Sequence, residues 1–281
     1  MASLQWWRRR WQSSSRSKGA GFGLRKGTYP NILKTQSLLD TDGTRQTSRR
    51  PAGKGDQYFY FSMSLLIPVI VVYGFSFTVD RNLIHPAVPR PVILYFHAAV
   101  FSGWLLLFIL QSALVRSRHV RWHRRIGWFG LGHGIAVTVL GISTAITMAR
   151  FNTVQLHSTS EESNLMVPLF DMVCFTATFA LAIYWRTKPE FHRRLIFLAT
   201  CALTAAAFGR FPERLLPSYL FYGGVDLLIL LGVARDLIVQ RSVHRVYVCV
   251  LPAFILGQTI VTYTVLHELQ YWRKIAHAML G

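Results

Sequence analysis

The sequence predicts an all-α fold, a polytopic integral membrane bundle of about seven transmembrane helices. Hydrophobic residues make up 52% of the 281-residue chain and charged residues only 15%, with a mean hydropathy of +0.31. This composition is typical of membrane proteins rather than soluble domains. From Tyr58 onward, apolar runs long enough to cross a hydrocarbon core of about 30 Å follow one another, separated by short turns rich in arginine.

Residues 1–57 form a separate basic segment. They contain twelve Lys and Arg against three Asp and have no helical periodicity. We expect a disordered cytoplasmic tail that touches anionic lipid through Trp6, Trp7 and Trp11 and the arginines between them. Although the net charge is +19, no folded soluble domain remains to read a nucleic acid, so the lipid bilayer is the expected partner and nucleic acid is not.

The transmembrane domain is expected to occupy residues 58–266. Each span is set by an apolar run of about 17 to 25 residues. The seven expected spans are Tyr58–Val79, Pro91–Val115, Ile126–Ala149, Val167–Trp185, Leu195–Phe211, Tyr219–Val239 and Val246–Leu266.

Charged residues in the turns predict the orientation. One set of turns carries most of the Lys and Arg, and the opposite set carries few. Because Lys and Arg are retained on the cytoplasmic side, we expect a multi-pass protein of the cell inner (cytoplasmic) membrane with its N-terminus in the cytoplasm. The short tail, residues 267–281, then lies along the outer interface.

Three related segments indicate an internal repeat. The third, fifth and seventh spans open with WHRRIGWFG at Trp122, FHRRLIFLA at Phe191 and VHRVYVCVL at Val243. This pattern predicts three hairpins built on one plan after a lone first helix. Repeats of this kind usually place a functional site where they face one another.

Each span that precedes a repeat segment holds one ionisable residue in its outer half. These residues are His97, Asp171 and Asp226. Because charges within the hydrocarbon are costly, the three define a candidate buried polar site for a proton- or cation-coupled transporter. The alternative is that each group only fastens helices together through a partner, for example Arg210, Tyr222 or Ser102, in a scaffold or assembly factor without a ligand.

Histidines at the basic turns define a candidate cofactor site. Imidazole is the usual axial ligand of a non-covalent haem b, and both ligands must lie at one depth on different helices. The candidate ligands are His97, His123, His192 and His244. An outer haem would need His157 or His267 as the mate of His97. The alternative for the inner three is that His-Arg-Arg at a helix start anchors the protein to lipid phosphate.

The sequence predicts no cofactor besides haem b. Cys174, Cys201 and Cys249 lie inside apolar runs without a CxxC or CxxCH pattern, so we expect neither a covalent haem nor a metal site. No motif of soluble-type catalysis stands out, and no enzyme class is predicted. Glycines at positions 127, 134 and 141 share one face of the third span, where they would let a neighbouring helix approach closely.

The pattern of residues in the first hairpin resembles a family of uncharacterised bacterial multi-pass membrane proteins that carry a domain of unknown function. The residues that carry the resemblance are His97, Gly103, Gln111, Leu114, Arg116, Arg118, His123, Arg124 and Gly127, followed by His192, Arg193 and Arg210. The spread of histidines is also similar to that of transmembrane b-type cytochromes. This looser resemblance implies a haem b-binding protein that transfers electrons to quinone or to membrane redox partners.

Overall fold

The computed structural model describes residues 54–158 and 160–280, and within these ranges all regular structure is helical. The all-α fold class is therefore confirmed. Six of the helices are long and apolar enough to cross a membrane. The predicted basic tail, residues 1–57, lies outside the described residues except for its last four, which begin the first helix.

The described helices follow the order of the predicted spans. The long helices are α2 (Lys54–Ser76), α3 (Ile93–Arg116), α4 (Val120–Gln155), α6 (Met166–Tyr184), α7 (Pro189–Ala202), α9 (Phe221–Gln240) and α10 (Arg245–Leu266). Short elements connect them: η1 (Asp80–Ile84), α5 (Glu161–Asn164), α8 (Ala205–Phe208) and η2 (Ser218–Leu220), with α11 (Gln270–Leu280) at the end.

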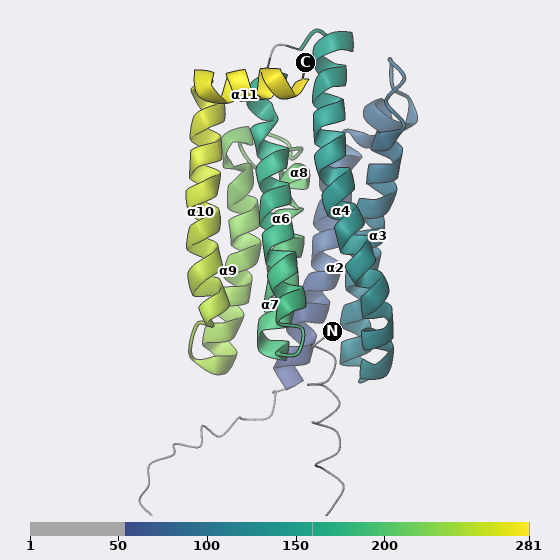
Figure 1. Ribbon diagram of the computed structural model, residues 1–281. Helices are drawn as coiled ribbons and strands as arrows, with labels where there is room; N and C mark the ends of the chain where they lie inside the picture. The colour runs from purple at the N-terminus through teal and green to yellow at the C-terminus, as the bar shows by residue number, and fades with distance from the viewer. Residues whose placement is uncertain (1–53, 159, 281) are drawn as a thin grey trace, which may run out of the picture. The chain divides into compact units, whose positions relative to one another are not determined.

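Helix α9 corresponds to the sixth predicted span and stands apart from the six candidate spans by its charged residues. It is 20 residues long and runs beside the other long helices (Figure 1). It carries three charged residues, Asp226, Arg235 and Asp236, and is for this reason not among the six candidate spans. The seventh helix is therefore present, and its charges require partners inside the protein.

Two predicted spans differ from the helices that form. Helix α4 has 36 residues, and at about 1.5 Å per residue it exceeds the thickness of a hydrocarbon core. The fifth span is divided between α7 and α8. At the break, the hydroxyl of Thr204 donates to the carbonyl oxygen of Cys201 at 2.6 Å, and the backbone N–H of Thr204 bonds the same carbonyl, which tightens the chain locally.

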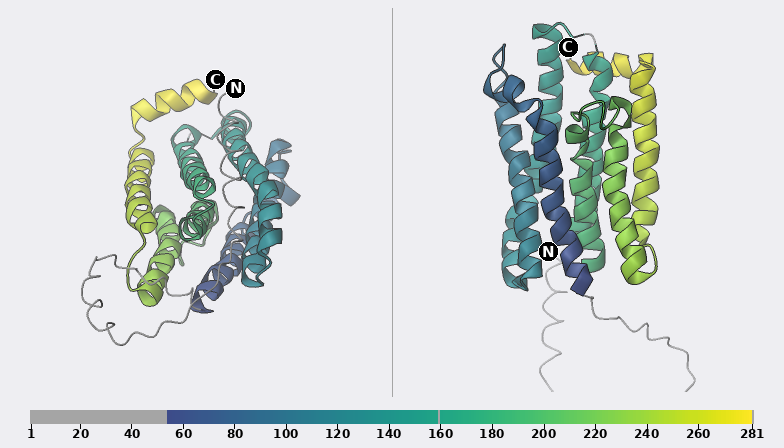
Figure 2. Two further views of the ribbon diagram at one scale, coloured as in Figure 1. Left: turned by 60° about the horizontal axis from the view of Figure 1, so that its bottom comes forward. Right: turned by 180° about the vertical axis from the view of Figure 1, so that it is seen from behind.

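The expected hairpins form, but they are not equivalent. Helix α3 packs extensively on α4, and α6 packs on α7, whereas α9 and α10 touch only sparsely. The turns of all three hairpins lie at one end of the bundle, which we call the basic end, at the bottom of Figure 1. The opposite end carries η1, α8 and α11 (Figures 1 and 2).

Helix α11 lies across the opposite end of the bundle, nearly at right angles to α10 (Figure 1). Its buried residues Ala276 and Leu280 pack against Ala149 of α4 and Leu165 beside α5. The indole nitrogen of Trp272 donates to the carbonyl oxygen of Glu162 at 2.8 Å. These contacts hold α11 against the ends of α4 and α5.

Glycines on α4 allow the close approach of α6, as the sequence predicted. A Cβ at Gly134 would overlap the ring of Phe179, and one at Gly141 would overlap the side chain of Met172. A Cβ at Gly127, in contrast, would meet nothing within 4 Å. Two of the three predicted glycines therefore face α6, and Gly127 does not.

Candidate functional site

Two of the four candidate haem ligands lie together at the basic end. The rings of His123 and His192 have centroids 6.3 Å apart and planes inclined at 78°. Each histidine is the fourth residue of its helix, α4 or α7, so the repeat places both at the same depth. Both side chains are half-buried.

Hydrogen bonds fix the Nδ1 atom of each ring. His192 Nδ1 lies 2.9 Å from the carbonyl oxygen of Ala182, so this nitrogen carries the proton and Nε2 keeps its lone pair. His123 Nδ1 lies 2.5 Å from the side-chain amide of Gln111. The Nε2 atoms of both rings are thus left for other partners.

Gln111 of α3 decides the tautomer of His123. In the orientation that satisfies the whole amide, its oxygen accepts from the backbone N–H of Gly127 at 3.2 Å, and its nitrogen donates to His123 Nδ1 and to the His123 carbonyl. His123 then carries its proton on Nε2. The two rings thus offer one Nε2 lone pair, on His192, and one Nε2–H group, on His123.

His244 does not join this pair. It is the N-cap residue of α10, and its Nδ1 atom accepts from the backbone N–H of Val246 at 3.2 Å. Its ring packs edge-on against Phe191 with centroids 4.6 Å apart. Because α10 begins one residue after its histidine, whereas α7 begins three residues before its own, the third repeat is out of register.

His97 lies at the opposite end of the bundle, in the first turns of α3. Its ring stacks on Phe101 with centroids 4.0 Å apart, and its Nδ1 atom is buried without a hydrogen-bond partner among the described residues. It belongs neither to the His123–His192 pair nor, by any hydrogen bond within the described ranges, to Asp171 or Asp226. The four candidate ligands therefore do not form one site.

Asp171 of α6 and Asp226 of α9 have different hydrogen-bonding partners. The hydroxyl of Tyr222 donates to Asp171 Oδ1 at 3.2 Å, and both side chains are more than 90% buried. Asp226 follows Tyr222 by one turn of α9, and Gln258 of α10 lies next to its carboxyl group. The alternative to a transport role was that Asp171 only fastens helices together through a partner such as Tyr222. The hydrogen bond from Tyr222 is a contact of this kind.

A buried charge cluster beside the histidine pair was not predicted. Arg194 of α7 and Asp236 of α9 have side chains that are 0% exposed, and Nε and Nη2 of Arg194 donate to the two carboxylate oxygens of Asp236. Arg194 Nη1 also donates to Glu190, and Arg235 pairs with Asp236. The sequence signal was the Arg-Asp pair inside the otherwise apolar run of α9.

Helix α2 joins this cluster through an aromatic ring. The guanidinium groups of Arg193 and Arg235 lie over the ring of Tyr60 at 5.4 and 5.5 Å from its centroid. Such cation–π contacts gain strength where water is excluded. The cluster therefore ties α2, α7 and α9 together at the basic end, next to the residues that position His192.

Among residues 54–158 and 160–280, no group of three or more His, Cys, Asp or Glu side chains is arranged to hold a metal ion. Comparisons with protein-family models, with curated proteins and with solved structures return no match. Any function must therefore be argued from the sites themselves.

Proposed function

We propose that the His123–His192 pair binds haem b, and that the protein transfers electrons within the membrane. The observation that carries this proposal is the separation of 6.3 Å between the two ring centroids, on different helices at one depth. We also propose that the basic end faces the cytoplasm of a bacterial cell, because its turns hold most of the arginines that follow residue 58.

The spacing of the two rings suits a shared metal. A metal–imidazole bond is about 2 Å long. When two imidazoles bind opposite sides of one metal, the distance between their ring centroids is the sum of two such bonds and two nitrogen-to-centroid distances, which is roughly 6 Å. The tautomer of His192 also suits ligation, since a metal-binding histidine typically donates its other N–H to a carbonyl group. Arg124 follows His123 directly, and its charge lies close enough to act on this ring. It could pair with a haem propionate.

Gln111 must turn for His123 to become a ligand. In its present orientation the amide donates to Nδ1 and thereby keeps the proton on Nε2. A rotation of the amide would let its oxygen accept from Nδ1–H, and the Nε2 lone pair would then face the metal. When bound, haem b supplies a one-electron couple, which could serve quinone or a membrane redox partner.

A reduced-minus-oxidised visible spectrum tests the proposal. The detergent-purified protein, expressed with haem precursor, should show a sharp b-type band that His123→Ala and His192→Ala each abolish. His244→Ala and His119→Ala are matched controls, since both change a histidine at the basic end outside the pair, and they should keep the band. A protein that remains colourless at full haem supply refutes the proposal.

A second candidate, from another class, is proton- or cation-coupled transport through Asp171 and Asp226. The observation in its favour is a carboxyl group, that of Asp171, that is more than 90% buried and has Tyr222 as its partner. In vesicles that contain a pH-sensitive dye, Asp171→Asn should abolish proton flux at an imposed potential. Asp80→Asn, which changes an exposed carboxylate of η1, should leave the proton flux unchanged. Equal flux in wild type and Asp171→Asn would exclude this candidate.

A further inference from the structure

The last turn of α2 packs against α8 and the segment that follows it, at a contact that we call the clasp. Gly74 faces Ala207 so closely that a Cβ would overlap the carbonyl oxygen of Ala207. On one side of this contact, Tyr73 packs on Phe211 with ring centroids 5.0 Å apart. On the other side, the guanidinium group of Arg210 lies 4.4 Å from the ring centroid of Phe75.

Two arginines meet at this clasp without a counter-charge. Arg210 is half-buried and donates to the carbonyl oxygen of Ala206, and Arg81 of η1 lies near enough to act on it electrostatically. Burial lowers the pKa of Arg210, and the like charge of Arg81 lowers it further. Within the described ranges, no ion pair joins either arginine to a carboxylate, and the neighbouring Asp80 pairs with His85 at 2.7 Å.

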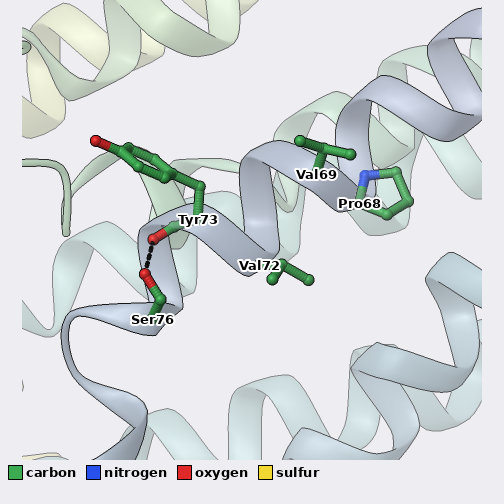
Figure 3. Close-up of a pocket in the computed structure, with 5 residues that line it drawn as sticks. All are labelled: Pro68, Val69, Val72, Tyr73 and Ser76. Atoms are coloured by element: carbon green, nitrogen blue, oxygen red, sulfur yellow. Dashed lines mark hydrogen bonds between the residues drawn. The ribbon is translucent and has the colours of Figure 1, made fainter.

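An apolar groove leads along α2 toward the same turn. Figure 3 shows its lining, with Pro68 at one end and Tyr73 and Ser76 at the other. Val69 and Val72 are 64% and 68% exposed, and the hydroxyl of Ser76 is occupied by the carbonyl oxygen of Tyr73 at 2.7 Å. The groove thus offers a mostly apolar surface, in which the hydroxyl of Tyr73 is the one polar side-chain group besides the occupied hydroxyl of Ser76.

We propose that Arg81 and Arg210 bind the phosphate of an anionic phospholipid, with one acyl chain in the groove between Pro68 and Ser76. Paired guanidinium groups match the geometry of phosphate oxygens, and a phosphate removes the cost of two adjacent cations that lack a counter-ion. A free anion would use only the two arginines, whereas a phospholipid would also place an acyl chain in the apolar groove of α2. The groove therefore favours a lipid as the ligand. This proposal is independent of the histidine pair at the other end of the bundle.

The test counts lipids bound to the delipidated protein by native mass spectrometry. Phosphatidylglycerol should bind, and phosphatidylcholine, whose headgroup carries no net charge, should bind far less. Arg210→Gln and Arg81→Gln should each weaken phosphatidylglycerol binding about tenfold, since one charge-assisted hydrogen bond is lost. Arg214→Gln, which removes an exposed arginine of the same end, should have no effect.

A second pair of variants tests the groove. Val72→Trp fills it and should weaken binding, whereas Val248→Trp, on the exposed face of α10, should not. Arg81 is exposed, so Arg81→Gln remains informative even if Arg210→Gln fails to fold. The proposal is wrong if phosphatidylglycerol and phosphatidylcholine bind equally well. It is also wrong if Arg214→Gln weakens phosphatidylglycerol binding as much as Arg210→Gln and Arg81→Gln do. If glycerol phosphate alone stabilises the protein as well as the lipid does, the ligand is a free anion and the lipid assignment is wrong.

Discussion

Arg194 and Asp236 form a bidentate ion pair that is closed off from solvent, with Nε–Oδ2 and Nη2–Oδ1 distances of 2.8 and 2.7 Å. The two residues are 42 positions apart and lie on α7 and α9. Buried ion pairs need not stabilise a protein more than apolar residues would. Breaking one from a single side, however, leaves an isolated charge in a medium that solvates it poorly.

We therefore predict that Asp236→Ala lowers the free energy of unfolding by about 3–5 kcal/mol. The physical reason is that the buried Arg194 loses both hydrogen bonds to Asp236 and keeps only the half-exposed Glu190 as a carboxylate partner. Thermal unfolding in detergent measures the effect. Glu190→Gln is the matched control, because Glu190 also bonds Arg194 but its side chain is 50% exposed, so the loss should be much smaller. Equal losses in both variants would contradict this prediction.

Helix α4 offers a test of close packing. Gly134→Ala should destabilise the protein by about 1–3 kcal/mol, since the new methyl group overlaps Phe179 and the core must shift to admit it. Gly132→Ala, two residues away, meets nothing within 4 Å and should be neutral or slightly stabilising. The measurement is the unfolding temperature of each variant in detergent, compared with that of the wild type. A neutral Gly134→Ala would mean that α6 does not approach α4 at this glycine.

The contact between Asp171 and Tyr222 can be measured by a double-mutant cycle. We expect a coupling energy of up to about 1.7 kcal/mol between Asp171→Asn and Tyr222→Phe, the upper range found for hydrogen bonds between membrane helices. The cycle should be run on unfolding in mixed micelles. Pairing Asp171→Asn with Tyr219→Phe, which changes an exposed tyrosine beside α9, should give additive effects.

His244 should make stability depend on pH. Burial, and then the positive charge of Arg194, lowers the pKa of His244, while Asp236 and Glu190 act in the opposite direction. Because the folded value lies below the unfolded value of about 6.5, the unfolded chain binds the proton first. Above that pH, His244 is neutral in both states and does not reduce the free energy of unfolding. As the pH falls below it, proton binding to the unfolded chain lowers the free energy of unfolding.

His244→Asn keeps an acceptor at the N-cap position and should reduce this loss of stability at acidic pH. Unfolding temperatures between about pH 5 and pH 8 for wild type and variant provide the comparison. His119→Asn changes an exposed histidine at the basic end and should leave the profile as it is. Parallel profiles for wild type and His244→Asn would show that His244 does not contribute.

Apolar length and turn charge were enough to predict the membrane helices, because both are local properties of the chain. The depth of His123 and His192 was also predictable, since in both repeats the histidine is followed by two arginines and stands fourth in its helix. The displacement of His244 was not, because it depends on where α10 begins. The partner of Asp236 could not be assigned either, since Arg194 is one of many arginines in the basic turns and only packing selects it.

The segment that comprises α7 and α8, Pro189–Phe208, is the most enclosed of the six candidate spans and also the least apolar, with a mean hydropathy of 1.2. During biosynthesis it leaves the ribosome before α9, so for some forty residues of synthesis Arg194 has no Asp236 to pair with. A helix of this kind gains little from lipid alone and depends on its neighbours to stay inserted. The protein is therefore expected to complete its insertion late, when α9 arrives, and truncation before α9 should leave α7 exposed to membrane quality control.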